Sequence, residues 1–352
     1  MCRSRSRWIA PLFLAAAAAL GCEMPPDSAA APSEFPDAGG PIARPPQRVA
    51  GAGAPSFTVV ALPDTQFYAA AYPAIFDAQA NWLLEQAQAG GLAFVLHEGD
   101  IVDDDVGPQW VVAAASLHRL DGIVPYVLSA GNHDYPGDGW SGSRSTLIDA
   151  YFPIATFAGD AWFGGTFEPD HIENNYALFD VPGGGRWLIL SLEFGPRDEV
   201  LAWANAIAKQ YASTPAMVVT HAYLYDDDTR YDQAHRPDQR WNPHSYPIDV
   251  GPGSVNDGEE IWQKLILGNS NIRFVFCGHV VDRGVGRLTS VRPDGTTVHQ
   301  VLANYQMLAQ GGEGYLRLMQ FFPTLGAVHI QTYSPYLDAF KTDPDDDFSL
   351  EY

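Results

Sequence analysis

Two short apolar segments of this sequence each end in a glycine that is followed at once by acidic, amide or imidazole side chains. The first lies within residues 93–103 and the second within residues 124–134. In an open α/β sheet, binding and catalytic sites lie beyond the carboxyl ends of the strands. Gly99 and Gly131 would let the chain turn sharply there, because glycine tolerates backbone angles that other residues avoid. The rest of the chain either supports these two turns or adds side chains to them.

Three further strands, expected at 57–62, 216–220 and 272–277, also end in polar groups. The five strand endings offer Asp64 with Gln66, Asp100 with Asp103, Asn132 with His133 and Asp134, His221, and His279. A cation needs several oxygen or nitrogen ligands within about 2–2.6 Å, so convergence of these groups at one sheet edge predicts a metal site. The set contains no thiolate, and such mixed ligands suit Mn, Fe, Zn or Mg.

The first third of the folded part alternates between strand and helix patterns. Strands are expected at 57–62, 93–97 and 124–129, with helices between them at 73–89 and 108–120. This alternation indicates parallel βαβ units. Beyond residue 284 the pattern becomes all-β. Residues 135–175 and 222–257 form two long polar loops, and loops of this length in a compact domain are functional or disordered.

The N-terminus has the features of an export signal. Three arginines precede an apolar run from Trp8 to Leu20, which is too short for a comfortable transmembrane helix. Ala19-Leu20-Gly21-Cys22 is similar to a bacterial lipoprotein cleavage box, which implies a lipidated Cys22 in residues 1–22. The alternative is an ordinary signal peptide with an incidental cysteine. Residues 23–56 are rich in Pro, Ala and Gly and are expected to be a disordered tether.

Charge and cysteine usage exclude some classes of function. The formal net charge is -22, which opposes binding to nucleic acid because that affinity comes mostly from phosphate neutralisation. Cys2 and Cys22 lie in the N-terminal segment, so Cys277 is alone in the folded part and no disulfide framework is possible there. Residues 341–352 are expected to be a solvated acidic tail.

At this point the sequence resembles a known family. Gly99-Asp100-Ile-Val-Asp103 and Gly131-Asn132-His133-Asp134 are similar to signatures of the calcineurin-like metallophosphoesterases, and the order of all five strand endings matches. The stretches Leu62-Pro-Asp-Thr-Gln66, Asn304-Tyr-Gln306 and Thr332-Tyr-Ser-Pro335 resemble a secreted bacterial branch of that superfamily.

The resemblance implies a four-layer α/β/β/α sandwich over residues 57–340, with two metals beneath a phosphate. Asp100 would bridge both ions. Asn132, His221 and His279 would complete one site, and Asp64 and Gln66 would contribute to the other. His133 would be the general acid, oriented by Asp134. Paired cations clamp the attacking and leaving oxygens and lower the pKa of a bound water.

Two departures from the family pattern affect the same metal site. Gln66 stands where the family usually has His, and Val281 stands where it has the second His of Gly-His-x-His. Asp282, Asn304 and Gln306 are possible replacements. We therefore expect either one tight ion with a weak, exchangeable second ion, or a single tight ion, with Mn, Fe or Zn as the candidates.

These observations predict an exported or lipid-anchored phosphoesterase that hydrolyses phosphate mono- or diesters. Its partner would be the phosphoester substrate, and its only contact with a membrane would be a lipid anchor. The alternative is a degenerate phosphoesterase fold that serves as a surface binding module with a structural metal, and the acidic charge disfavours a third reading, a nuclease. Substrate and oligomeric state are left open.

Overall fold

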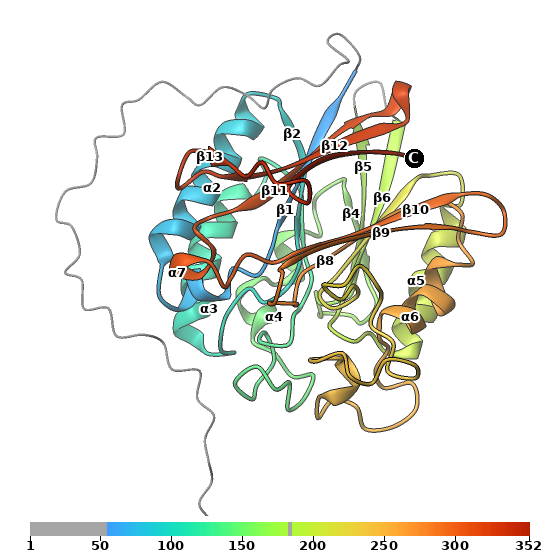
Figure 1. Cartoon of the computed structure of the whole chain (residues 1–352). Coiled ribbons are helices and arrows are strands. Elements are labelled where there is room, and N and C mark those ends of the chain that lie inside the picture. Colours follow the sequence, from blue (N-terminus) through green and yellow to red (C-terminus); the bar gives the residue numbers. More distant parts are fainter. Residues whose placement is uncertain (1–54, 182–184) are drawn as a thin grey trace, which may run out of the picture. The chain divides into compact units, whose positions relative to one another are not determined.

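The computed structural model describes residues 55–181 and 185–352 (Figure 1). The predicted signal peptide at 1–22 lies outside the described residues, as does the predicted tether at 23–56 except for its last two residues. Within the described residues, none of the helices combines the length and the apolarity that crossing a bilayer requires.

The first sheet has the strand order β13-β12-β11-β1-β2-β3, and β14 pairs with β12 at its side. Neighbours β1, β2 and β3 run parallel, whereas β11 to β14 pair antiparallel. The strands are β1 (Phe57–Leu62), β2 (Leu92–His97), β3 (Tyr126–Leu128), β11 (Leu316–Phe322), β12 (Ala327–Ser334), β13 (Ala339–Phe340) and β14 (Asp347–Glu351).

The second sheet has the order β4-β5-β6-β7-β8-β10-β9, with β6, β7, β8 and β10 parallel. Strands β5 and β6 pair antiparallel on either side of residues 182–184, which lie outside the described part. The strands are β4 (Phe163–Thr166), β5 (Asn175–Val181), β6 (Gly185–Leu192), β7 (Ala216–Thr220), β8 (Ile272–Cys277), β9 (Val285–Val291) and β10 (Thr297–Ala303).

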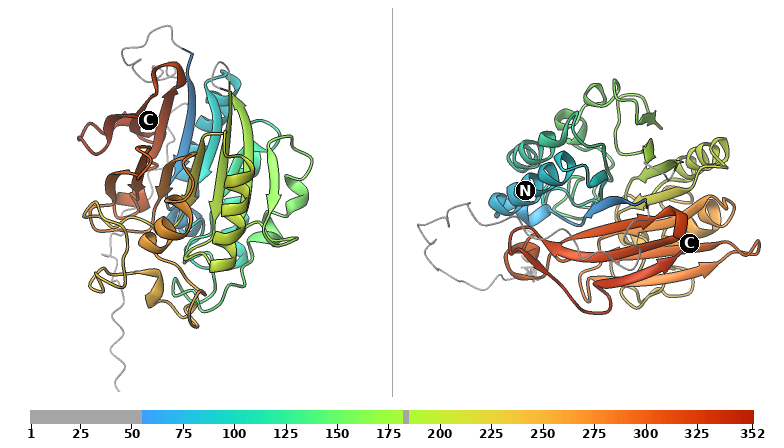
Figure 2. Two further views of the ribbon diagram at one scale, coloured as in Figure 1. Left: turned by 90° about the vertical axis from the view of Figure 1, so that its right-hand side faces the viewer. Right: turned by 90° about the horizontal axis from the view of Figure 1, so that it is seen from above.

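Helices cover the outer faces of the two sheets (Figure 2). On the first sheet lie α1 (Gln66–Ala70), α2 (Pro73–Gln88), α3 (Gly107–Leu117) with the 3-10 turn His118–Leu120, and α4 (Ile148–Tyr151). On the second lie α5 (Asp198–Gln210) and α6 (Gly258–Ile261), which continues as a π-helical turn over Trp262–Ile266. The short α7 (Ala309–Gly312) follows β10, and further 3-10 turns span Ile154–Thr156, Pro243–Ser245 and Pro323–Leu325.

Three apolar clusters hold these layers together. One lies between the first sheet and its helices, a second between the second sheet and its helices, and the third between the two sheets. The central cluster takes the alternate side chains of the facing strands, such as Val59 and Phe94 from one sheet and Ile189 and Phe274 from the other. The predicted four-layer α/β/β/α sandwich is thereby confirmed.

The expectation of a solvated acidic tail at 341–352 is wrong for its last part, which forms β14. Phe348 and Leu350 alternate with polar residues and pack into the cluster between the sheets, so this segment follows the two-residue period of a strand. Asp346 is buried and accepts hydrogen bonds from Tyr305 and Thr332. The run of aspartates concealed this apolar alternation.

Candidate metal centre

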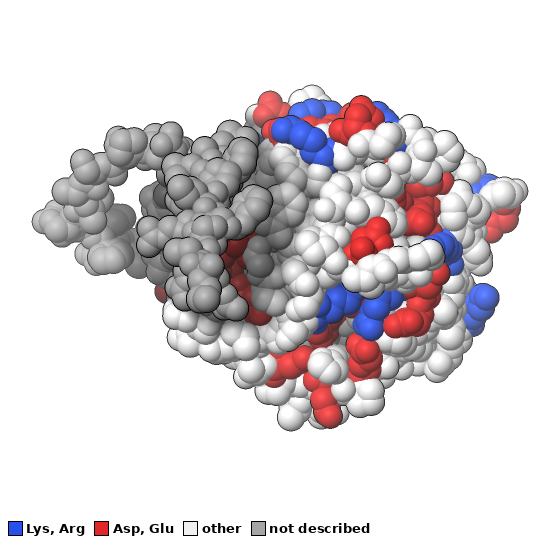
Figure 3. All heavy atoms as spheres, turned by 90° about the horizontal axis from the view of Figure 1, so that it is seen from below, with Lys and Arg blue, Asp and Glu red and all other residues white. Residues whose placement is uncertain are grey.

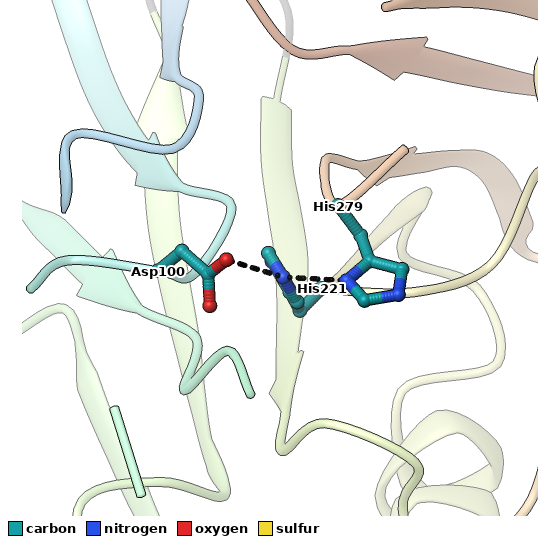
Figure 4. Close-up of side chains that lie close together, drawn as sticks. All are labelled: Asp100, His221 and His279. Atoms are coloured by element: carbon teal, nitrogen blue, oxygen red, sulfur yellow. Dashed lines mark hydrogen bonds and ion pairs between the residues drawn. The ribbon is translucent and has the colours of Figure 1, made fainter. Parts of the chain in front are cut away.

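Five side chains lie beyond the carboxyl ends of strands from both sheets. Asp64, Asp100 and Asn132 follow β1, β2 and β3, and His221 and His279 follow β7 and β8. All five are buried. The two sheets face one another, so these endings meet at one end of the sandwich, where Asp100, His221 and His279 point toward a common centre (Figure 4).

The centre is defined by short distances from one atom, Nε2 of His221. This nitrogen lies 3.1 Å from Oδ1 of Asn132 and 3.2 Å from Oδ2 of Asp100. It also lies 3.1 Å from Nδ1 of His279 and 3.9 Å from Oδ1 of Asp64. The predicted convergence of these five groups is therefore present.

Backbone carbonyls decide which nitrogen of each imidazole carries its proton. Nδ1–H of His221 donates to the carbonyl of Glu98 at 2.8 Å, and Nε2–H of His279 donates to the carbonyl of Trp241 at 2.8 Å. In its neutral form, each ring therefore turns an unprotonated nitrogen toward the centre. Such bonds commonly fix the tautomer of metal-binding histidines.

The amide of Asn132 is oriented in the same way. Its Nδ2 donates to the carbonyl of Gly139 at 2.8 Å, which leaves Oδ1 facing His221. The centre is consequently lined by two imidazole lone pairs, an amide oxygen and carboxylate oxygens, all of them acceptors. Acceptors do not hydrogen-bond one another, so the arrangement fits a cation, and the donor set of N and O atoms fits Mn, Fe or Zn.

Electrostatics at the centre point the same way. Burial, followed by the nearby charges of Asp100 and Glu98, raises the pKa of Asp64 well above its usual value. Burial together with His221 lowers the pKa of His279 to about 3, so this imidazole is neutral at physiological pH. A divalent cation bound here would stabilise the ionised form of the crowded carboxylates and the neutral form of the imidazoles.

The turns that carry the ligands are sterically demanding. Asp64, Asp100 and His279 have positive φ angles of 20°, 49° and 76°. A Cβ on Gly131 would lie 2.1 Å from Oδ1 of Asp100, and one on Gly278 would lie 2.2 Å from Oδ2 of Asp64. Unfavourable backbone conformations of this kind persist at functional sites where the surrounding structure holds them.

Gln66 is the first residue of α1, and its side chain is buried. Its Nε2 donates to Oδ1 of Asp103 at 3.2 Å, while its buried Oε1 has no hydrogen-bond partner within the described residues. An unpaired buried oxygen is costly, and a cation would satisfy it. Gln66 therefore has one buried oxygen that a cation could satisfy.

The general acid predicted at His133 lies beside the centre. Its backbone N–H donates to Oδ1 of Asp100 at 2.9 Å, and its Nδ1–H donates to the carbonyl of Asp103 at 2.6 Å. A Cβ on Gly139 would lie only 2.6 Å from Nε2 of His133, so glycine there allows the loop to approach the ring. Burial lowers the pKa of His133, but the charge of Asp100 and the Asp103 carbonyl outweigh it and leave that pKa above its usual value.

The orienting role expected of Asp134 is wrong. Its carboxylate accepts hydrogen bonds from the backbone N–H groups of Ile101, Val102 and Gly131 at 2.8–3.0 Å. Asp134 thus ties together the two turns that carry Asp100 and Asn132. The two residues are neighbours in a turn, where Asp134 is fully buried and the His133 side chain is 25% exposed, so their side chains face different ways.

Sequence reasoning missed the carbonyls that set the imidazole tautomers. Trp241 belongs to the loop at 222–257 and Gly139 to the loop at 135–175, so both long loops contribute directly to the centre. Tyr246, from the first of these loops, packs against His279 and Phe194. A main-chain carbonyl leaves no signal in a sequence, because every residue has one.

Comparison with known proteins agrees with this geometry. Residues 57–283 match the family model of calcineurin-like phosphoesterases. The chain belongs to the calcineurin-like phosphoesterase family. Members of this family bind divalent metals and act on phosphoesters, and Asp100, His221 and His279 form a group that could hold such an ion.

One curated relative is the uncharacterized protein YvnB of Bacillus subtilis (strain 168), which is 32% identical over 309 residues. That match covers 84% of this calcineurin-like chain but only 21% of the relative, so the chain spans about a fifth of its length.

Among solved structures, the purple acid phosphatase PPD1 of yellow lupin (Lupinus luteus) is 16% identical, with a TM-score of 0.47 over 85% of this chain and 54% of that one. The NAD nucleotidase of Haemophilus influenzae is 13% identical, with a TM-score of 0.40 over 82% of this chain and 49% of that one.

Proposed function

We propose that this chain hydrolyses phosphate mono- or diesters with metal-activated water. One divalent ion of Mn, Fe or Zn would be held tightly by Asp100, Asn132, His221 and His279. A second, weaker ion would be held by Asp64 and Gln66 with Asp100. The observation that carries this proposal is the convergence of imidazole, amide and carboxylate atoms around Nε2 of His221.

The bound ions supply Lewis acidity and a water of lowered pKa. The residues of the chain do the remaining work. Trp241 and Glu98 keep the imidazoles in the binding tautomer through their carbonyls, and Asp134 fixes the two turns. Because these contacts exist before substrate arrives, the ligands need little rearrangement on binding.

His133 is placed to protonate the leaving oxygen. Its Nδ1–H is engaged by the carbonyl of Asp103, so Nε2 is the nitrogen that can hold a transferable proton. The side chain is 25% exposed, unlike the metal ligands, and can therefore reach a substrate that enters from solvent. A positioned imidazole supplies the proton that a departing alkoxide needs.

The possible replacements for the missing histidine at position 281 are already engaged elsewhere. Asp282 is exposed and forms an ion pair with Arg240. Nδ2 of Asn304 donates to Oε1 of Gln306 at 3.1 Å, and the backbone N–H of Gln306 donates back to Oδ1 of Asn304 at 2.9 Å. Val281 instead lines a cavity of about 470 Å³. These contacts support an asymmetric pair of sites in which the second ion is weak.

The decisive experiment compares the wild-type protein with His279→Ala on p-nitrophenyl phosphate and bis(p-nitrophenyl) phosphate, with added Mn²⁺. His235→Ala is the matched control, because His235 is 79% exposed and pairs only with Asp232. We expect turnover in the wild type and the control and its loss in His279→Ala. Equal turnover in all three proteins would remove the metal centre from the reaction.

A binding module is the second candidate, and Val281 is the observation that favours it. In that case a single ion would have a structural role only. Metal-loaded wild-type protein that binds phosphate but turns over neither substrate would establish this alternative.

Nucleic acid is not expected as a substrate. Acidic and basic side chains stand next to one another on the face shown in Figure 3, and the net charge is strongly negative. Salt-sensitive binding to DNA would contradict this expectation.

We further propose that the protein is exported and anchored by a lipid on Cys22. The support comes from the sequence alone. It consists of the three arginines near the N-terminus, the short apolar run that follows them, and Ala19-Leu20-Gly21-Cys22. In a bacterial host, wild-type protein should sediment with membranes and Cys22→Ser should not. Equal release of both proteins from membranes would exclude the anchor.

A further inference from the structure

A second group of potential metal ligands lies outside the calcineurin-like centre, in the loop at 135–175. Asp149 comes from α4 (Figure 1), and His171 and Glu173 come from the segment before β5. Each residue offers one ligand atom, and the three atoms lie within 4.8 Å of one another. We propose that Asp149, His171 and Glu173 form a Zn²⁺ site that clips α4 to the segment leading into β5.

The contacts within this group are already short. Nδ1 of His171 lies 2.8 Å from Oδ2 of Asp149 and 3.8 Å from Oε1 of Glu173. The other oxygen of Asp149 accepts the backbone N–H of Ile172 at 2.9 Å, which holds the carboxylate against this segment. The ligand atoms therefore face one another before any ion is bound.

Glu173 supplies an independent observation that points to a cation. Its side chain is only 9% exposed, and its Oε2 has no hydrogen-bond partner among the described residues. A buried carboxylate oxygen without a partner is costly. A divalent ion bound at Oε1, which lies 3.8 Å from Nδ1 of His171, would neutralise this buried carboxylate together with that of Asp149.

The donor set indicates zinc. One imidazole and two carboxylates resemble zinc sites in which three protein ligands leave a position for water. Calcium prefers six to eight oxygens, which three side chains that include an imidazole do not provide. His171 is 55% exposed, so an ion could enter from solvent.

A third group of potential metal ligands consists of His244, Asp257 and Glu260, and we propose no metal site there. Both ring nitrogens of His244 are occupied, by Asp249 at 2.8 Å and Glu260 at 2.7 Å. Asp257 accepts backbone N–H groups as the cap of α6. Every polar atom there already has a partner, whereas Glu173 has an unpaired one.

The site would brace the loop that reaches the catalytic turns. Just before Asp149, the hydroxyl of Thr146 donates to the carbonyl of Asp134 at 2.6 Å, and the N–H of Leu147 donates to Asp105 at 3.0 Å. A cation that joins Asp149 to His171 would close the intervening stretch of loop. Closing a flexible loop in this way restricts the unfolded chain and stabilises the fold.

Zinc counting on the full chain tests the site. Wild type, His171→Ala, Glu173→Gln and the control His235→Ala are loaded with Zn²⁺, freed of loose metal by gel filtration and analysed by mass spectrometry. We expect His171→Ala and Glu173→Gln each to bind one zinc fewer than wild type and the control. His171 is exposed, so its variant should fold even if Glu173→Gln does not.

The same comparison in a His279→Ala background separates this site from the catalytic centre. There, Zn²⁺ should still raise the melting temperature, and the added substitution His171→Ala should abolish that rise. Equal zinc content in wild type and His171→Ala would overturn the proposal. Replacement of the bound zinc by equimolar Ca²⁺ would overturn the assignment of the ion.

Discussion

Nε2 of His221 lies 3.1 Å from Nδ1 of His279, and the nitrogen on the opposite side of each ring is bonded to a backbone carbonyl, so in the neutral rings the two facing nitrogens carry lone pairs. Two lone pairs at this distance repel one another unless a cation lies between them or one ring takes up a second proton. This relationship is the basis for the proposed phosphoesterase chemistry.

Removal of one of these nitrogens should therefore weaken metal binding sharply. We expect His279→Ala to lower the affinity for Mn²⁺ by at least about 100-fold, since even second-layer partners of metal ligands contribute 10- to 100-fold. Isothermal titration calorimetry measures the change. An unaltered affinity, with His235→Ala as the control, would place the ion elsewhere.

A histidine restored at position 281 should strengthen the weak second site. We expect Val281→His to raise the affinity for the second ion by about tenfold or more, because it restores the second imidazole of the family's Gly-His-x-His pattern. Asp282→His serves as the control, because that side chain points to solvent and pairs with Arg240. Two ions of equal, high affinity in the wild type would contradict the proposed asymmetry.

The role of His133 should depend on the leaving group. We expect His133→Ala to lower kcat on an alkyl phosphoester by about 10²- to 10⁴-fold. The loss on a p-nitrophenyl ester should be far smaller, because p-nitrophenolate leaves without protonation. An equal loss on both substrates would argue against proton donation by His133.

Asp134 should affect stability more than proton transfer. Asp134→Asn turns an amide N–H toward one of the three backbone donors, which we expect to cost about 1–3 kcal/mol of unfolding free energy in urea. The ratio of rates on alkyl and p-nitrophenyl esters should stay as in the wild type. A ratio that shifts as in His133→Ala would restore the orienting role to Asp134.

The pH dependence of stability should include a contribution from His244. Its bonds to Glu260 and Asp249 raise the pKa of His244 to about 9 in the folded protein, above the unfolded value near 6.5. The stabilisation is therefore fully present below about pH 6.5 and is lost as the pH rises through about 9. The difference in unfolding free energy between wild type and His244→Gln should shrink over that interval. A difference that grows with pH would contradict the charged pair.

The convergence of ligands was predictable because it depends on strand endings. Apolar runs that stop at Asp64, Asp100, Asn132, His221 and His279 locate the sheet edge, and parallel strands bring such endings together. The departures at Gln66 and Val281 are also visible in the sequence, since each is a single side chain at a known position of a motif.

Other features depended on contacts that no local pattern encodes. The carbonyl of Trp241 reaches His279 across 38 positions of the sequence, through a long loop without periodicity. Asp134 was assigned from its neighbour His133, yet its carboxylate is taken up by the backbone N–H groups of distant Ile101 and Val102 and of Gly131. The last strand was not predicted because the aspartates were interpreted as a solvated charge run. In the structure, Phe348 and Leu350 of this segment pack into the cluster between the sheets.

Crystals soaked in Mn²⁺ and measured at the manganese absorption edge test the central claim most directly. The account predicts an anomalous peak within about 2–2.6 Å of Nε2 of His221, Nδ1 of His279, Oδ1 of Asn132 and a carboxylate oxygen of Asp100. A peak that avoids these four atoms, or none at a Mn²⁺ concentration that supports turnover, would contradict it.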